Sequence, residues 1–351
     1  MRAPNYAPLD EALEILAPYG PQTKGQLSNH GPMAAEAMCA LGREDAVLDW
    51  VTRYREILGP RQGTRAAVRA ANWRDALGRI DRIGDWTAYF DNELEEHPWQ
   101  EVLDRWLDRL APGFAAVAAH GPIRTGHAVR ALADSDTPAR RRELSDALAY
   151  WAASFAVLPG RHHSRTHGMA RPSEAIRWVK LLPLWRRRLR VSIAGGLVQL
   201  NGFEPFAHTL DMVDAGGDAS AFIGDLTGTF AELFLSNART ALSAIAFIHT
   251  VTGPAALRPM IPFVRKPTMA HALRYAWQSS AAIYARYGTR ASPGETPAAQ
   301  VEGDHRLADR AIASGDEHAI KFTEACLRER QFSPRAPFRA AAQHAVRLLS
   351  R

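Results

Sequence analysis

Apolar residues recur at intervals of three and four positions along almost the whole of this 351-residue sequence. That spacing places them on one face of an α-helix, whereas a strand would need strict alternation. It predicts helices over residues 9–16, 33–41, 45–58, 99–110, 140–158, 173–182, 219–235, 241–251, 269–287 and 318–327. The best strand candidate is RVSIAGGLVQL, residues 190–200, which fits a helix equally well. We therefore expect an all-α protein, a multi-helix array or bundle with its functional site in the helical core.

Proline and glycine interrupt the helical pattern at several points, but the composition does not change from one part of the chain to another. No internal repeat of 20–50 residues is present, which argues against a repeat array. We expect a single helical domain over residues 1–351. A boundary near residues 160–172 is a weaker alternative.

The net charge is +6 and the isoelectric point is about 9.6, values that also occur in nucleic-acid-binding proteins. Here, however, arginines alternate with aspartate and glutamate along predicted helices, as in residues 73–86 and 101–114. Such alternation is typical of a solvated helix face with internal ion pairs. No nucleic-acid-binding motif accompanies the two denser arginine clusters, so we expect no nucleic-acid partner.

The N-terminal residues MRAPNYAPLDEALEIL contain no signal-peptide core. No stretch approaches the ~20 uninterrupted apolar residues that span a bilayer. The two cysteines, Cys39 and Cys326, lie inside predicted helices and form neither a disulfide framework nor a zinc pattern. These features predict a cytoplasmic protein without a membrane partner.

The sequence lacks the motifs of several common classes of enzyme. It lacks a G-x-G-x-x-G between a strand and a helix, a Walker phosphate loop, a G-x-S-x-G elbow and an H-E-x-x-H motif. A self-contained nucleotide-binding domain, a serine hydrolase and a zinc peptidase are thereby disfavoured.

Thirteen histidines are present, and several lie among small or apolar residues of predicted helices. The candidates for a site are His30, His120, His127, His249 and His318. Any one of them alone is more often a core histidine that has found a hydrogen bond. Together, four separate helices each offer an imidazole, which is how a helix bundle builds a metal site in its core. Imidazole suits iron, zinc, copper or nickel better than magnesium or calcium.

Lysine is rare in this chain: of 43 basic residues, 39 are arginine and 4 are lysine. Lys321 follows His318 by three positions and therefore projects from the same helix face. A buried lysine can lose its proton, and its neutral amine can then add CO2. The alternative is a helix-face cation paired with Glu317 or Glu324.

Arg124 belongs to the same predicted helix as His127. Its guanidinium could bind a phenolate or carboxylate of a substrate, or it could form an ordinary ion pair.

Five stretches resemble, in order, the motifs of the questin-oxidase-like family: LSNHGPMAAEAMCALG, HGPIRTGHAVRAL, FIHTVTGPAALRPMIP, RYAWQSSAAIYARYG and DEHAIKFTEACL. The similarity runs from about residue 8 to 330. It implies an all-helical oxygenase. Fungal members open the central ring of anthraquinones by Baeyer–Villiger-type or ring-cleaving chemistry. In at least one branch, the site is thought to hold non-haem iron bound by four histidines and a carboxylated lysine.

Carried onto this sequence, the resemblance makes Lys321 the carboxylated lysine and leaves five candidates for four histidine positions. Because His120 precedes its predicted helix, we expect it to act with Arg124 on the substrate or on protons. The expected ligands of Fe(II) are then His30, His127, His249, His318 and Lys321.

The resulting expectation is an oxidoreductase of secondary metabolism, an Fe(II)-dependent oxygenase or oxidase with O2 as co-substrate. Its substrate would be a small aromatic or polyketide-like natural product, and NADPH is a candidate source of electrons. Two alternatives are an NADPH-dependent oxidase without bound metal and a helical protein that only binds a small molecule.

Overall fold

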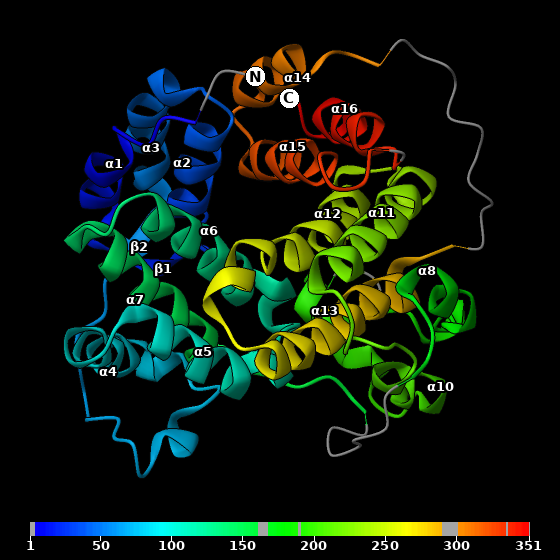
Figure 1. Ribbon diagram of the computed structural model, residues 1–351, viewed down its shortest axis with the longest axis horizontal. Coiled ribbons are helices and arrows are strands. Elements are labelled where there is room, and N and C mark those ends of the chain that lie inside the picture. Colours follow the sequence, from blue (N-terminus) through cyan, green and yellow to red (C-terminus); the bar gives the residue numbers. More distant parts are fainter. Residues whose placement is uncertain (1–3, 161–167, 189–190, 290–300, 335, 351) are drawn as a thin grey trace.

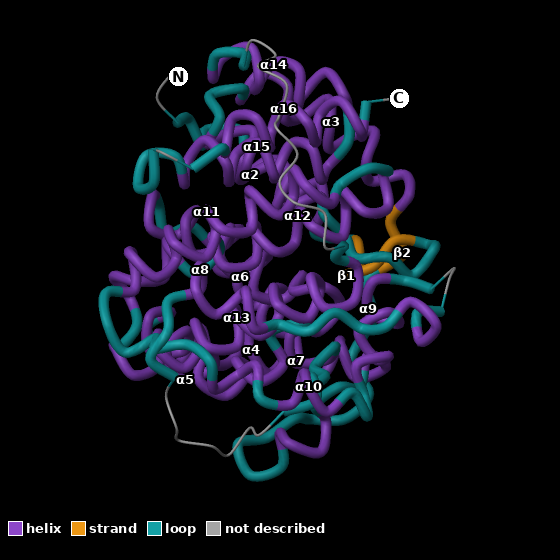
Figure 2. Tube along the Cα trace, turned by 90° about the vertical axis from the view of Figure 1, so that its right-hand side faces the viewer, coloured by secondary structure: helices purple, strands orange, loops and turns teal. Residues whose placement is uncertain are grey.

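The structure is a computed structural model that describes residues 4–160, 168–188, 191–289, 301–334 and 336–350. Within these ranges the chain is all-α, with one small two-stranded sheet at the edge of the molecule in Figure 2. None of the described helices is both long enough and apolar enough to cross a membrane.

The α-helices are α1 Leu9–Leu16, α2 Gly31–Ala40, α3 Val47–Tyr54, α4 Ile83–Glu96, α5 Trp99–Leu110, α6 His120–Asp134, α7 Pro138–Ala153, α8 Pro172–Ala175, α9 Ile193–Leu197, α10 Glu204–Ala207, α11 Ala219–Asn237, α12 Ala241–Ala255, α13 Lys266–Tyr287, α14 Asp304–Ser314, α15 Glu317–Glu329 and α16 Phe338–Leu349. Short 3-10 turns join several of them. The strands β1 Tyr19–Thr23 and β2 Leu58–Pro60 pair antiparallel.

Four helices from distant parts of the sequence form a ring in the middle of the protein. Helix α2 packs on α6 and α15, and α12 packs on the same two helices. In Figure 1, α6 and α12 run through the centre, while α2 and α15 close the ring above them. All five candidate histidines belong to this ring or to the residue just before it. The ring is therefore the frame of the site.

Apolar packing holds the ring from both sides. Below it, the T-shaped ring pairs of Trp86, Phe90 and Trp106 join α4 to α5. These three side chains are fully buried. A second apolar cluster joins α1, α2 and α3 around residues such as Met38 and Trp50.

The sequence identifies most of the long helices, but α4, α14 and α16 were not expected, and the short elements are identified poorly. Residues 190–200, the expected strand candidate, form α9 and a 3-10 turn in their described part. The true strands were not expected, because β1 contains glycine and proline and lacks alternation. Only residues 173–175 of the expected helix 173–182 are α-helical, as the last three residues of α8. Of the alternative boundary at 160–172, residues 161–167 lie outside the described part.

Gly126 provides a test of how tightly the ring is packed. A Cβ added there would come within 2.7 Å of the Ala256 Cβ and 2.9 Å of its Cα, just past the end of α12. We expect Gly126→Ala to lower the free energy of unfolding by about 1–3 kcal/mol, because overpacking forces the two segments apart. The measurement is urea denaturation. Gly217→Ala is the control, since nothing lies within 4 Å of that position; equal effects of the two changes would contradict tight packing at Gly126.

Candidate metal centre

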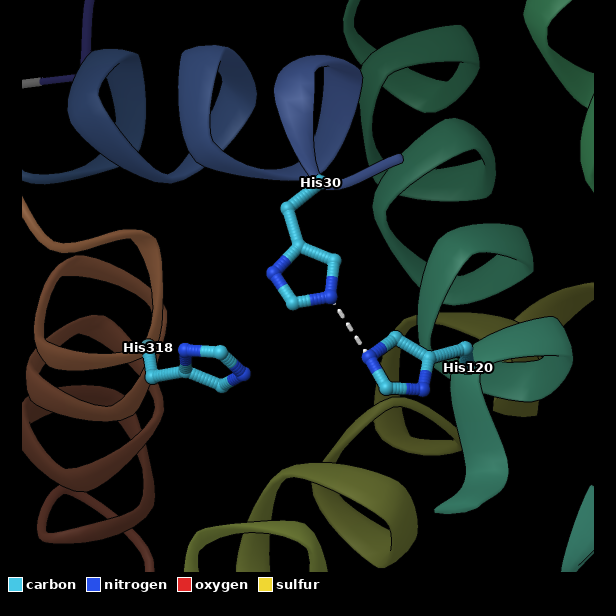
Figure 3. A group of neighbouring side chains, drawn as sticks. All are labelled: His30, His120 and His318. Carbon is cyan, nitrogen blue, oxygen red and sulfur yellow. Dashed lines mark hydrogen bonds between the residues drawn. The ribbon is translucent and has the colours of Figure 1, made fainter. Parts of the chain in front are cut away.

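Four imidazole rings, His30, His120, His249 and His318, meet inside the ring of helices. The Nε2 atom of His120 lies 2.7 Å from Nε2 of His30 and 3.4 Å from Nε2 of His249. The ring of His318 lies 4.6 Å from that of His30 and 5.8 Å from that of His249, centroid to centroid. Figure 3 shows His30, His120 and His318 pointing toward one another from three different helices.

Three of these rings stand at the start of a helix. His30 caps α2, His120 is the first residue of α6, and His318 is the second residue of α15. In α2 and α6 the same tripeptide, His-Gly-Pro, makes this start. The proline suits the first turn, where its missing N–H is not needed. The glycine allows close packing: a Cβ at position 121 would lie 2.6 Å from the Trp151 Cβ.

A left-handed stretch of backbone leads into His120. Val117, Ala118 and Ala119 all have positive φ, at 47°, 56° and 64°. Each costs roughly 1–2 kcal/mol in a residue with a side chain. The stretch turns the chain back on itself, so that the Val117 carbonyl accepts a hydrogen bond from Nδ1 of His120. Residues 116–119 pack against α12 and α9 as well as α6, and this packing holds the strained conformation.

Backbone carbonyls set the tautomers of two rings. Nδ1 of His120 faces the Val117 carbonyl, and Nδ1 of His249 lies 2.6 Å from the Ile245 carbonyl. A carbonyl oxygen only accepts, so each Nδ1 must carry the hydrogen. In a neutral ring, Nε2 is then left with a lone pair that points into the cluster. Nδ1 of His30 instead lies 3.4 Å from a carboxylate oxygen of Glu317.

The cluster favours uncharged imidazoles. Burial, and then neighbouring charges that include Lys321, hold the pKa of His30, His120 and His249 well below its ordinary value. The Nε2 atoms of His120 and His249 are therefore available as electron-pair donors at neutral pH.

Neutral rings in these tautomers create a conflict that a cation would relieve. The Nε2 lone pairs of His120 and His249 face each other at 3.4 Å with no hydrogen between them. Two nitrogens bound to one metal at about 2.1 Å lie roughly 3–3.4 Å apart. Each ligating ring usually donates its other N–H to a carbonyl or carboxylate, the pattern seen here for His120 and His249. The donor set therefore fits a transition metal that prefers nitrogen, such as iron, zinc or copper.

Lys321 lies one helical turn beyond His318 and is 2% exposed. Its Nζ lies 4.0 Å from the Met33 sulfur, and no ion pair of this lysine occurs among the described residues. Glu324, one of its two expected alternative partners, instead pairs with Arg130 and Arg328. Burial lowers the pKa of Lys321 from 10.5 to about 8, although Glu317 and Asp316 act in the opposite direction.

The structure places His127 away from the four rings. Its Nδ1 lies 2.6 Å from Glu36, which also pairs with Arg130. His127 shares a helix face with His120, but it lies about 10.5 Å further along the helix axis, and its ring is hydrogen-bonded to Glu36 instead of contacting the other imidazoles. We had expected His127 to join His30, His249 and His318. In the structure, His120 is the α6 histidine that lies with these three rings. The shared His-Gly-Pro tripeptide was the signal in the sequence that pairs His120 with His30.

His127 belongs to a separate buried network. Burial alone would raise the pKa of Glu36, but Arg130 and His127 hold it well below its usual range. Glu36 is therefore an anion, and it also accepts a hydrogen bond from Tyr6 at 2.9 Å. His127 and Arg130 of this network line the same small cavity as Lys321. The network therefore lies next to the lysine side chain.

Arg124, the expected substrate-binding arginine, is occupied by an internal partner. Its Nε and Nη2 each lie 2.6 Å from an oxygen of Glu143 on α7, and both side chains are buried. This bidentate pair ties α6 to α7.

Neither a protein-family model nor a curated protein matches this chain.

Lys321 gives the site a measurable dependence on pH. In metal-free, CO2-depleted protein its folded pKa of about 8 lies below the ordinary 10.5, so the unfolded state binds more protons between those values. Stability should therefore rise as pH increases from 8 to 10.5. Lys321→Met should lack this rise and should be more stable than the original protein at pH 7 by roughly 3 kcal/mol.

Urea denaturation at pH 7 and pH 10 measures both effects. Lys266→Met is the matched control, because Lys266 is exposed. A Lys321→Met protein that is less stable than the original at pH 7 would show that the buried amine is stabilised by its surroundings.

Proposed function

We propose that this protein is an Fe(II)-dependent oxygenase or oxidase in which His30, His120, His249 and His318 hold the metal. The observation that carries the proposal is the short distance between the Nε2 atoms of His120 and His249. Each of these rings carries its hydrogen on Nδ1, where it is donated to a backbone carbonyl, so neither Nε2 has a hydrogen to share. Iron is favoured over other nitrogen-preferring metals by the resemblance to the questin-oxidase-like family. When bound there, a ferrous ion would supply electrons for the activation of O2.

The four rings match the number of histidines that the family resemblance implies. They come from α12, α15 and the starts of α2 and α6, so no two adjacent residues share the task. His120 takes part as a ligand in this proposal, and His127 supports the site through Glu36 and Arg130.

Lys321 supplies the fifth ligand in the proposal. Its neutral amine adds to CO2: a nitrogen–carbon bond forms, one C=O π bond breaks and a proton is released. The product is a carbamate anion, which offers oxygen in place of a cationic amine. Two features favour this reaction: the depressed pKa of Lys321 and the lack of a paired carboxylate among the described residues.

The surrounding residues orient the rings and limit water. The Val117 and Ile245 carbonyls fix two rings, and Glu317 faces the Nδ1 atom of His30. The backbone N–H of His30 donates to the Tyr54 hydroxyl at 2.9 Å, which anchors the chain just before α2 begins. His30, His120 and His249 are at most 7% exposed, so the donor atoms lie in a largely dry space.

The proposed activity is oxidation of an aromatic or polyketide-like natural product by Baeyer–Villiger-type or carbon–carbon cleaving chemistry. This substrate class rests on the family resemblance. Arg124 is left out of substrate binding in the proposal, because Glu143 occupies its guanidinium.

Metal binding distinguishes the two candidate histidines on α6. We expect protein purified under nitrogen to hold close to one iron per chain. His120→Ala should lower the affinity for Fe(II) by more than the 10–100-fold typical of residues that only support ligands. His127→Ala should keep the metal, and its affinity for Fe(II) should fall by at most 10–100-fold. Iron content and Co(II) titration measure both.

His271→Ala serves as the control, because His271 is partly exposed and pairs with Asp108 on the surface. Protein that binds no Fe(II) even after anaerobic reconstitution would overturn the metal site. Loss of iron from His127→Ala but not from His120→Ala would reassign the ligand to His127.

The carbamate has its own test. Reconstitution with Fe(II) in CO2-depleted buffer should give less bound iron than reconstitution with bicarbonate, and the difference should vanish in Lys321→Met. Lys321→Arg should behave like Lys321→Met, because a guanidinium stays protonated and cannot add CO2. Normal iron binding by Lys321→Arg would contradict the carbamate and leave the four-histidine site standing.

A further inference from the structure

A surface hollow of about 480 Å3 lies apart from the histidine cluster, on the chain between α8 and α10. Its wall includes Trp185, Arg186, Arg188, Val198 and Gln199. The volume falls within the range of small-molecule sites, roughly 300–1,000 Å3.

One part of the wall is apolar and open to water. Trp185 is 85% exposed and Val198 is 63% exposed. Most other tryptophans of the chain are buried, among them Trp86, Trp106, Trp151 and Trp277. An indole ring left in solvent offers a flat face on which another planar ring can stack.

Two arginines, Arg186 and Arg188, line this hollow, and two more, Arg187 and Arg286, lie beside them; none has an acidic partner among the described residues. The guanidinium of Arg186 donates to the carbonyls of Asn201 and Gly202, and that of Arg187 donates to the carbonyls of Leu182 and Gly288. Arg286, near the end of α13, donates to the Arg188 carbonyl. None of the four forms an ion pair with a carboxylate in the described ranges. Burial, and then the charge of Arg286, lower the pKa of Arg187.

Of these four arginines only Arg286 is buried, whereas Arg186 and Arg187 are half-buried and Arg188 is exposed. Two other buried arginines of the protein have carboxylate partners. Arg258 meets Glu329 at 2.6 Å, and Arg124 meets Glu143 at the same distance. Buried cations normally require such partners. The buried charge of Arg286 therefore lacks a carboxylate partner within the part of the chain that the structure describes.

Two buried hydrogen-bond donors also lack acceptors, one on the wall of the hollow and one on the neighbouring Arg286. Nε2 of Gln199 is buried without a partner, while its Oε1 accepts from the backbone N–H of Arg188 at 2.7 Å. Nε of Arg286 is likewise buried and unpartnered. Donors in excess of acceptors favour a ligand rich in oxygen acceptors.

We propose that the hollow binds a phosphorylated compound with a planar ring: the arginines hold the phosphate and Trp185 stacks on the ring. Several uncompensated charges suit a phosphate dianion better than a single carboxylate, and guanidinium forks match phosphate oxygens. The proposal is independent of the metal centre, because no residue of the hollow belongs to the histidine cluster.

Three probes separate the ring from the phosphate: 1-naphthyl phosphate, inorganic phosphate and 1-naphthol. Calorimetric titration of the full chain should show 1-naphthyl phosphate binding at least tenfold more tightly than either of the others. Trp185→Ala should reduce its affinity to that of inorganic phosphate. Arg188→Gln should weaken both phosphates by at least fivefold and leave 1-naphthol unchanged.

Matched controls stand a few residues upstream. Trp178→Ala and Arg177→Gln remove an exposed tryptophan and an exposed arginine outside the hollow, and neither should change binding. The proposal fails if 1-naphthyl phosphate binds no better than inorganic phosphate. It also fails if the control variants weaken binding as much as the variants in the hollow.

Discussion

The structure depends on bringing several nitrogen lone pairs together in a dry helical core. His120 accepts a hydrogen bond from Nε2 of His30 at 2.7 Å, but the lone pairs of His120 and His249 face each other at 3.4 Å, where two neutral imidazoles in these tautomers repel. Burying a polar atom without a partner costs on the order of 1–3 kcal/mol, so such a cluster lowers the stability of the folded protein. Much of the surrounding architecture can be understood as the means of holding it.

The histidine rings are held in place more by the backbone than by contacts between side chains. Two rings are fixed by carbonyls, and two are carried by helices that start with the same His-Gly-Pro tripeptide. The left-handed turn at residues 117–119 stores strain next to His120. Strain of this kind persists only where surrounding packing over-determines the conformation, and it often accompanies functional sites.

Periodicity was enough to find most of the long helices, including those that carry the site, but it missed α4, α14 and α16. Long amphipathic stretches such as α5 and α13 follow their predicted bounds closely, since one face of each must meet the core. The choice between His120 and His127 needed more, because a shared helix face says nothing about the distance along the axis. Partners across helices, such as Glu143 for Arg124 and Glu36 for His127, depend on tertiary packing that periodicity does not describe.

The near-absence of lysine has a consequence for the chemistry of the folded chain. Lys24, Lys180 and Lys266 are exposed, whereas Lys321 is buried beside the four rings. An amine-reactive reagent can therefore modify three lysine side chains while the helix ring stays closed. Modification of the fourth lysine requires the centre of the protein to open. Because arginines replace lysines almost everywhere else, the number of modified lysines directly reports whether the core is intact.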